Sequence, residues 1–302
     1  MANYERIMRL RPEVRQFLRS RRWVHRGDVI AYGPNIRCDA FSTDEQGFRH
    51  STFGGATLSA REAIAHERYG LVLGPSNVYG FGLAGNENTI PSLLAERLGF
   101  PFANISLPEG TSRNLYGLLA AIVDEARNPP TAVVHISGGD FTAVCYTAIA
   151  DPVFGPPNLK QMDMALRERG GFPAEPQIEP LLAFTRLWTR AIGQLCEGCG
   201  ARLVFGNDTT FFEKRNPSEF ELQCELGKSV APAQELRFAT HKRYVRDFAA
   251  NRDAMAKSLG VPIAGPGLAN DLGFIDEYHY DAAGTQALAQ DFGDALEALL
   301  AR

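Results

Sequence analysis

Five short apolar segments, alternating with helical patterns, dominate the sequence from residue 61 onward. Apolar runs of this kind are typical of strands buried on both faces of a parallel sheet. Strands that alternate with helices assemble into one such sheet with helices on either side. The sequence therefore predicts an α/β fold, with three α/β/α layers around a five-stranded parallel sheet. The expected strands are 70–73, 100–106, 131–137, 201–205 and 261–264, and the expected helices are 90–98, 112–127, 178–198, 241–259 and 282–300.

The first 60 residues do not follow this alternation. Residues 1–26 have a helical pattern and contain eight arginines, whereas 27–55 consist of short apolar pieces separated by turn residues. We interpret residues 1–60 as a small extension, helical and then β-rich, ahead of an α/β/α domain at 61–302. The arginines are interpreted either as the solvated face of a helix or as a surface that docks an acidic partner.

Two long insertions, near 145–177 and 208–236, interrupt the domain. The first is rich in proline and glycine, and the second is aromatic and charged. Loops of this length in a compact domain are usually functional. Both are expected to leave the carboxyl edge of the sheet, where ligands bind in such folds. We expect them to form walls or lids of a substrate site.

The composition excludes several classes of function. A net charge of −4 gives no reason to expect a nucleic-acid partner. No apolar run reaches the ~18 residues of a membrane span, and the arginine-rich start lacks the apolar core of a secretory signal, so a cytoplasmic location is expected. The cysteines are odd in number and lack framework spacing, which favours reduced thiols. Because Cys196 and Cys199 have no second ligand pair and no phosphate-binding loop is present, neither a metal nor a cofactor is expected.

The chemistry is concentrated in two segments. Ser76 lies in a Gly-Pro-Ser-Asn turn just after the first domain strand, and Asp276 precedes His279 by three residues near the C-terminus. A serine needs a base to become a nucleophile, and the base needs an orienting carboxylate. The chain carries all three in the order Ser…Asp…His. This arrangement predicts an acyl-transfer or ester-hydrolysis centre.

These segments resemble the sequence blocks of the SGNH hydrolases, also called GDSL-type esterases and lipases, over roughly residues 71–302. GPSNVYGFG at 74–82 looks like the first block, NISLPEGTS at 104–112 like the second, and DEYH at 276–279 like the last. GFR at 47–49 is similar to an N-terminal element of some members. The resemblance implies a flavodoxin-like sheet and a catalytic triad of Ser76, Asp276 and His279. It also implies an oxyanion hole that includes the backbone N–H groups of Ser76 and Gly110.

Two departures from the family pattern concern the oxyanion hole. Pro75 replaces the aspartate of the family's Gly-Asp-Ser. The third block, which in the family supplies an asparagine donor, is SGGD at 137–140, so the asparagine position is Gly139 or Asp140. Glycine has no side-chain donor, and an ionised aspartate only accepts hydrogen bonds. The Gly139 backbone N–H and the Asn207 side chain are the candidate replacements, and slow hydrolysis of simple activated esters is expected.

The sequence thus predicts a serine-dependent ester hydrolase or O-deacylase that acts on a small molecule or glycan through an acyl-enzyme. Two alternatives remain open. The same mechanism in an acyltransferase would deliver the acyl group to an acceptor other than water. A catalytically degenerate relative would bind a ligand without turnover.

Overall fold

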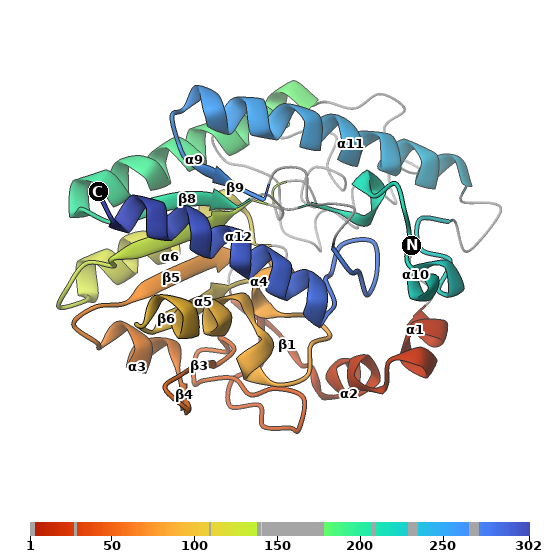
Figure 1. Cartoon of the computed structure of the whole chain (residues 1–302), viewed down its shortest axis with the longest axis horizontal. Helices are drawn as coiled ribbons and strands as arrows, with labels where there is room; N and C mark the ends of the chain where they lie inside the picture. The colour runs from red at the N-terminus through yellow and green to blue at the C-terminus, as the bar shows by residue number, and fades with distance from the viewer. Residues whose placement is uncertain are drawn as a thin grey trace.

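Within the part of the chain that the structure describes, five parallel strands form the central sheet (Figure 1). The structure is a computed structural model. It describes residues 4–26, 29–108, 110–137, 140, 178–206, 209–228, 235–265 and 272–302. The sheet strands are β5 (Gly70–Gly74), β6 (Phe102–Ser106), β7 (Ala132–Ile136), β8 (Arg202–Gly206) and β9 (Ile263–Ala264).

The strand order is β6-β5-β7-β8-β9, and every neighbouring pair is parallel. The chain runs outward from β5 to β6 and then returns to the other side of β5 to form β7. The direction of winding therefore reverses at β5. Open α/β sheets bind ligands beside such a reversal, at the carboxyl ends of the strands. The fold class and all five strands expected from the sequence are confirmed.

Alternating side chains of the buried strands supply two separate cores. Leu71 and Leu73 of β5 face one core, while Val72 between them faces the other. Helices α5 (Ile90–Leu98) and α12 (Ala282–Leu300) cover the Val72 face and pack against each other; Figure 1 shows them side by side in front of the sheet. The other face is covered by α3 (Ala60–Ile64), α6 (Ser112–Glu125) and α9 (Ile178–Cys199), with α11 (Glu235–Ser258) packed against α9.

The N-terminal extension differs from the single helix expected over residues 1–26. Two short helices are present, and a strand begins at Trp23. Arg11 is extended between the helices (φ −132°, ψ 86°) because a residue that precedes a proline, here Pro12, is disfavoured in the helical region. The extension contains α1 (Tyr4–Leu10), α2 (Pro12–Ser20) and two antiparallel hairpins, β1 (Trp23–Arg26) with β2 (Val29–Tyr32) and β3 (Ser51–Phe53) with β4 (Ala56–Leu58).

Part of the arginine charge is neutralised within the chain. Helix α1 lies beside α10 (Glu219–Gln223) (Figure 1), and Arg6 forms an ion pair of 2.7 Å with Glu225 just beyond α10. Arg11 lies 3.3 Å from Asp281, the N-cap residue of α12. The basic segment thus binds acidic residues of the C-terminal half, and an acidic partner stays a prediction.

The first insertion, 145–177, lies outside the described residues, as does Cys145. The second insertion is partly described and contains the 3₁₀ turn η2 (Phe211–Glu213) as well as α10. Phe211 donates its N–H to the Glu277 carbonyl, and the Phe212 ring lies 6.0 Å from that of Tyr278. This part of the insertion therefore packs against the loop that carries Asp276 and His279.

In the described ranges no helix is long and apolar enough to span a membrane. The same ranges hold no cluster of three metal-binding side chains. The described cysteines, Cys38, Cys196, Cys199 and Cys224, are all unpaired.

Candidate active site

Ser76 is the first residue of α4 (Ser76–Tyr79), directly after β5. Its Oγ lies 2.7 Å from Nε2 of His279, 203 residues away in sequence. Gly74 allows the tight turn between strand and helix, since a Cβ there would come within 2.4 Å of Val78 Cγ2. Ser76 and His279 are only half-buried. The hydroxyl therefore has a base within hydrogen-bond reach, and neither residue is fully buried.

The Asp276 carboxylate orients the other nitrogen of the histidine ring. His279 Nδ1 lies 2.9 and 2.8 Å from the two carboxylate oxygens. Oδ1 also accepts the backbone N–H groups of Tyr278 and His279, each at 2.9 Å. Ile275 donates its N–H to the His279 carbonyl and closes this loop. The structure thus brings Ser76, His279 and Asp276 together in the sequence-predicted order of contacts.

Burial and hydrogen bonding shift the pKa of Asp276 in opposite directions. Its side chain is 1% exposed, which by itself raises the pKa. The charge and hydrogen bond of His279, together with the Tyr4 hydroxyl and the Tyr278 N–H, outweigh burial, so the pKa of Asp276 is lowered overall. Asp276 is therefore ionised at neutral pH and can stabilise a protonated His279.

The plane of the His279 ring is held by Phe81. The two rings stack with centroids 4.0 Å apart and an interplanar angle of 24°. Phe81 is in turn packed edge-on against Phe17 of α2, at 5.0 Å. Because α2 supports Phe81 from behind, the N-terminal extension contributes to the orientation of the base.

Tyr4 was not among the residues expected at the site. Its hydroxyl donates a 2.6 Å hydrogen bond to Asp276 Oδ2. Burial and the neighbouring carboxylate raise the pKa of Tyr4 well above its usual range, so the phenol stays neutral and can donate. Nothing in the local pattern of α1 distinguishes this tyrosine, because its partner is 272 residues away.

Tyr4→Phe is expected to lower kcat/KM for ester hydrolysis by about tenfold, since hydrogen bonds to charged groups are among the stronger ones. The matched control is Tyr69→Phe, which removes a tyrosine hydrogen bond to the Asn128 carbonyl. Initial rates and melting temperatures of both variants provide the comparison. Equal losses of activity in the two would mean that Tyr4 acts only through general stability.

Arg49, from the GFR segment noted in the sequence, organises the loop that follows the nucleophile. Its side chain is fully buried, and burial lowers its pKa to about 10, so it remains charged at neutral pH. No carboxylate among the described residues lies within ion-pair distance of it. It donates instead to five backbone carbonyls and one side-chain oxygen: Ala40, Tyr79, Gly80, Leu83, Gly85 and Asn86 Oδ1.

The predicted oxyanion donors differ in whether their N–H groups are already hydrogen-bonded. No acceptor for the Ser76 N–H is found in the described part of the chain, as expected for the first turn of a helix. The Gly110 N–H is donated to the Leu107 carbonyl at 2.9 Å, so it has to leave that carbonyl before it can serve an oxyanion. Gly139 and Asn207 lie outside the described residues.

Asp140 does not act as a free charge beside the serine. Its two oxygens accept the N–H and the hydroxyl of Ser112, each at 2.6 Å, and its side chain is fully buried. It therefore binds the first turn of α6, where an anion is stabilised by the helix N-terminus. Asp140, one of the two candidates for the family's asparagine position, thus has both carboxylate oxygens hydrogen-bonded to Ser112.

Ser112 also lies 3.2 Å from His135 Nε2. The Ser112 hydroxyl donates its single proton to Asp140. In the contact with His135, Nε2 of the histidine is therefore the donor and the serine oxygen is the acceptor. His135 is completely buried, and burial lowers its pKa to about 3, so it stays neutral. This second serine–histidine pair is a core element, as expected for a histidine in the middle of β7.

The pH dependence of stability should report on Asp140. Burial raises its pKa to about 6, partly offset by the Ser112 hydrogen bonds, so the folded chain binds this proton more tightly than the unfolded chain. Its contribution to the free energy of unfolding is complete below about pH 4 and falls as the pH rises through about 6. Between those limits the free energy of unfolding of the wild type should fall by about 3 kcal/mol relative to that of Asp140→Asn.

Urea denaturation of both proteins at several pH values measures that difference. The exposed Asp39 provides the control variant Asp39→Asn, whose profile should follow that of wild type. Parallel profiles for wild type and Asp140→Asn would show that Asp140 does not titrate with a raised pKa.

No protein-family model matches the sequence, and no curated protein matches it. Solved structures do match. A carbohydrate acetylesterase family member from Sinorhizobium meliloti is 15% identical with a TM-score of 0.48, over 78% of this chain and 100% of its own. A GDSL-like lipase from Bacteroides thetaiotaomicron is 11% identical with a TM-score of 0.45, over 77% of this chain and 89% of its own. A third structure is 12% identical with a TM-score of 0.50, over 78% of this chain and 100% of its own. At such identities the likeness concerns the fold alone, which in this chain is an α/β/α arrangement around a five-stranded parallel sheet.

Proposed function

We propose that the chain is a serine-dependent ester hydrolase or O-deacylase that acts on an acyl ester of a small molecule or carbohydrate. The observation that carries the proposal is the continuous line of contacts from Ser76 Oγ through His279 to Asp276, at 2.7 and 2.8 Å. A serine hydroxyl with an oriented base within hydrogen-bond reach is suited to attack a carbonyl carbon.

In the proposed reaction Ser76 Oγ forms a bond to the acyl carbon while its proton passes to His279 Nε2. The negative charge on the carbonyl oxygen is stabilised by the Ser76 N–H and, once its turn opens, by the Gly110 N–H. The carbon–oxygen bond to the leaving alcohol then breaks, and His279 returns the proton to that alcohol. Water, activated by His279, attacks the acyl-enzyme, releases the carboxylic acid and regenerates Ser76.

Asp276 has two roles in this scheme. Its hydrogen bond to Nδ1 selects the tautomer in which Nε2 is free to accept the serine proton. Its charge then stabilises the imidazolium that forms in both halves of the reaction. An acyltransferase would use the same residues, with an acceptor alcohol in place of water.

Two observations favour the alternative of a protein that binds without rapid turnover. The Gly110 N–H is engaged with the Leu107 carbonyl, and the third block lacks its asparagine. Loss of a single oxyanion donor typically costs about 10²–10³ in rate. Slow hydrolysis of p-nitrophenyl acetate is therefore expected even if the triad is competent.

A fluorophosphonate probe separates the two cases. An active serine next to its base forms a stable phosphonyl ester, whereas a serine without an effective base does not react. We expect mass spectrometry to place the adduct on Ser76 in the wild type and to find none in Ser76→Ala. A wild-type protein that remains unlabelled after prolonged incubation would favour the binding protein over the enzyme.

A further inference from the structure

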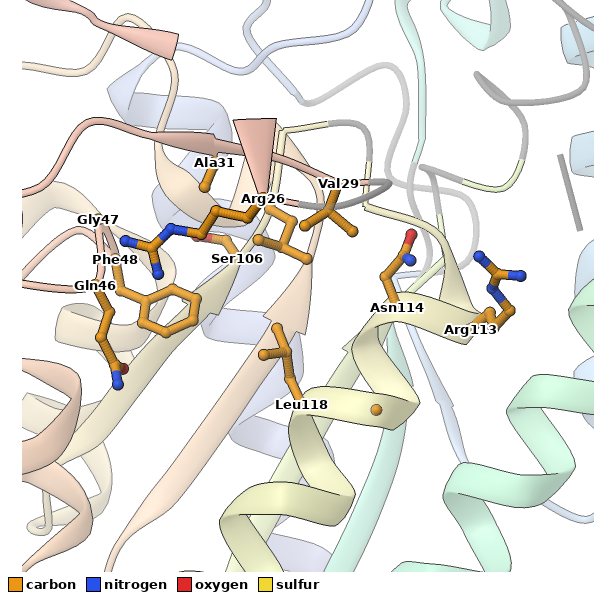
Figure 2. A pocket seen from close by; sticks show the side chains of 12 residues that line it. Arg26, Val29, Ala31, Gln46, Gly47, Phe48, Ser106, Arg113, Asn114 and Leu118 are labelled. Carbon is orange, nitrogen blue, oxygen red and sulfur yellow. The ribbon is translucent and has the colours of Figure 1, made fainter. Parts of the chain in front are cut away.

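A cavity of about 340 Å³ lies between the β1–β2 hairpin and the start of α6. Its wall is formed by Arg26 and Val29 of the hairpin, Gln46 and Phe48 of the following loop, Leu107 after β6, and Asn114 of α6. Figure 2 shows the hairpin residues above the cavity and the helix residues below it. A volume of this size is at the lower end of the range for ligand sites and suits one ring-sized group.

The charged groups that line this cavity are all cations, and its neutral polar side chains are those of Gln46, Ser106 and Asn114. Arg26 and Arg113 line it, and none of its described lining residues is acidic. The Arg26 side chain runs across the cavity toward Phe48 (Figure 2). Asn114 uses its side-chain oxygen to accept two bonds from Thr111, which leaves the two amide hydrogens as donors. Such a lining favours a negatively charged group.

The cavity is also close to the nucleophile. Leu107 donates its N–H to the Gly74 carbonyl, and Ser106 is paired with Gly74 in the sheet register. Gly74 precedes Ser76 by two residues. Neighbouring strands lie about 4.8 Å apart, so the end of β6 is one strand spacing from β5, the strand that precedes the serine. A group in the cavity can belong to the same molecule as an ester at Ser76.

We infer that this cavity binds an organic anion of ring size that is part of the ester substrate, with Arg26 as the cationic contact. The inference rests on the proposed function for its connection to Ser76, but the binding itself does not require turnover. Val29 and Phe48 contact the ring, and the Arg26 guanidinium, which lies beside Phe48 in Figure 2, binds its carboxylate or a similar anionic group.

The test uses benzoate and its uncharged analogue benzamide, which have nearly the same shape. Each is titrated into the Ser76→Ala protein and followed by the chemical shifts of backbone amides. We expect benzoate to bind with a Kd on the order of 1 mM, as is typical of a single ring-sized fragment, and at least tenfold more tightly than benzamide. Shifts should be centred on the loop that carries Phe48 and on the start of α6.

Three further variants, each made in the Ser76→Ala protein, test whether the Arg26 charge is responsible for benzoate binding. Arg26→Gln should weaken benzoate binding at least tenfold and leave benzamide binding unchanged, while Arg26→Lys should retain most of it. Arg19→Gln removes an exposed arginine from α2 and should have no effect. Equal binding of the two ligands, equal binding by Arg26→Gln, or no saturable benzoate binding would each overturn the inference. Because Ser76 is absent from all these proteins, failure here is distinct from failure to label Ser76 with the fluorophosphonate.

Discussion

Replacing Ser76 by alanine is expected to lower kcat for ester hydrolysis by about 10⁴–10⁶-fold, because the acyl-enzyme cannot form without the serine oxygen. The cost of Asp276→Ala should be roughly one to two orders of magnitude smaller than that of Ser76→Ala, because the base remains next to the serine and loses only its orientation and its counter-charge. Steady-state kinetics on p-nitrophenyl acetate, with active-site titration to count competent molecules, measures both effects.

The chain offers a matched control for this experiment. Ser42 Oγ lies 3.0 Å from His50 Nδ1, which makes a third, partly buried serine–histidine pair that does not involve Asp276. Ser42→Ala should retain wild-type kcat, and all variants should keep the wild-type circular dichroism spectrum. If Ser76→Ala turned over substrate as fast as wild type, the nucleophile would be another residue.

The second large effect is expected at Arg49. Arg49→Met should lower the free energy of unfolding by more than about 4 kcal/mol, because each buried carbonyl left without its donor costs about 1–3 kcal/mol. The residues that lose their donor include Tyr79 and Gly80, at the end of α4. The Ser76 turn should therefore lose its geometry before the rest of the sheet unfolds. Urea denaturation, together with hydrogen exchange of the Ser76–Gly85 amides, measures both consequences.

Two further substitutions serve as comparisons for Arg49→Met. Arg49→Lys retains the charge but has three donors on one nitrogen, so it cannot span the same carbonyls and should be intermediate. Arg61 forms an exposed ion pair with Glu45, and Arg61→Met should change stability by less than about 1 kcal/mol. A loss below about 1 kcal/mol in Arg49→Met would indicate that water replaces the guanidinium at these carbonyls.

Most of the central domain could be predicted because its signals are local. Each sheet strand is a short apolar run, and the helices carry their own ends, such as Gly99 after α5 and the Thr111 cap before α6. The N-terminal helix was the main error. The pattern of residues 1–26 is amphipathic over α1 and α2, but the backbone restriction before Pro12 and the pairing of Trp23–Arg26 with β2 outweigh helical periodicity.

The sequence by itself determined the five strands of the sheet and pointed to His279 and Asp276 as partners of Ser76, because parallel strands present their carboxyl ends at one edge. The strand order came from the tertiary structure. Only the tertiary structure decided what surrounds these residues. Tyr4, near the N-terminus, donates a hydrogen bond to Asp276. Ser112 donates to Asp140, and the Gly110 N–H donates to the Leu107 carbonyl. Each of these hydrogen bonds has a buried residue on at least one side: Asp276, Asp140 or Gly110. Periodicity predicts that a buried polar group needs a partner, but the three-dimensional packing selects which one.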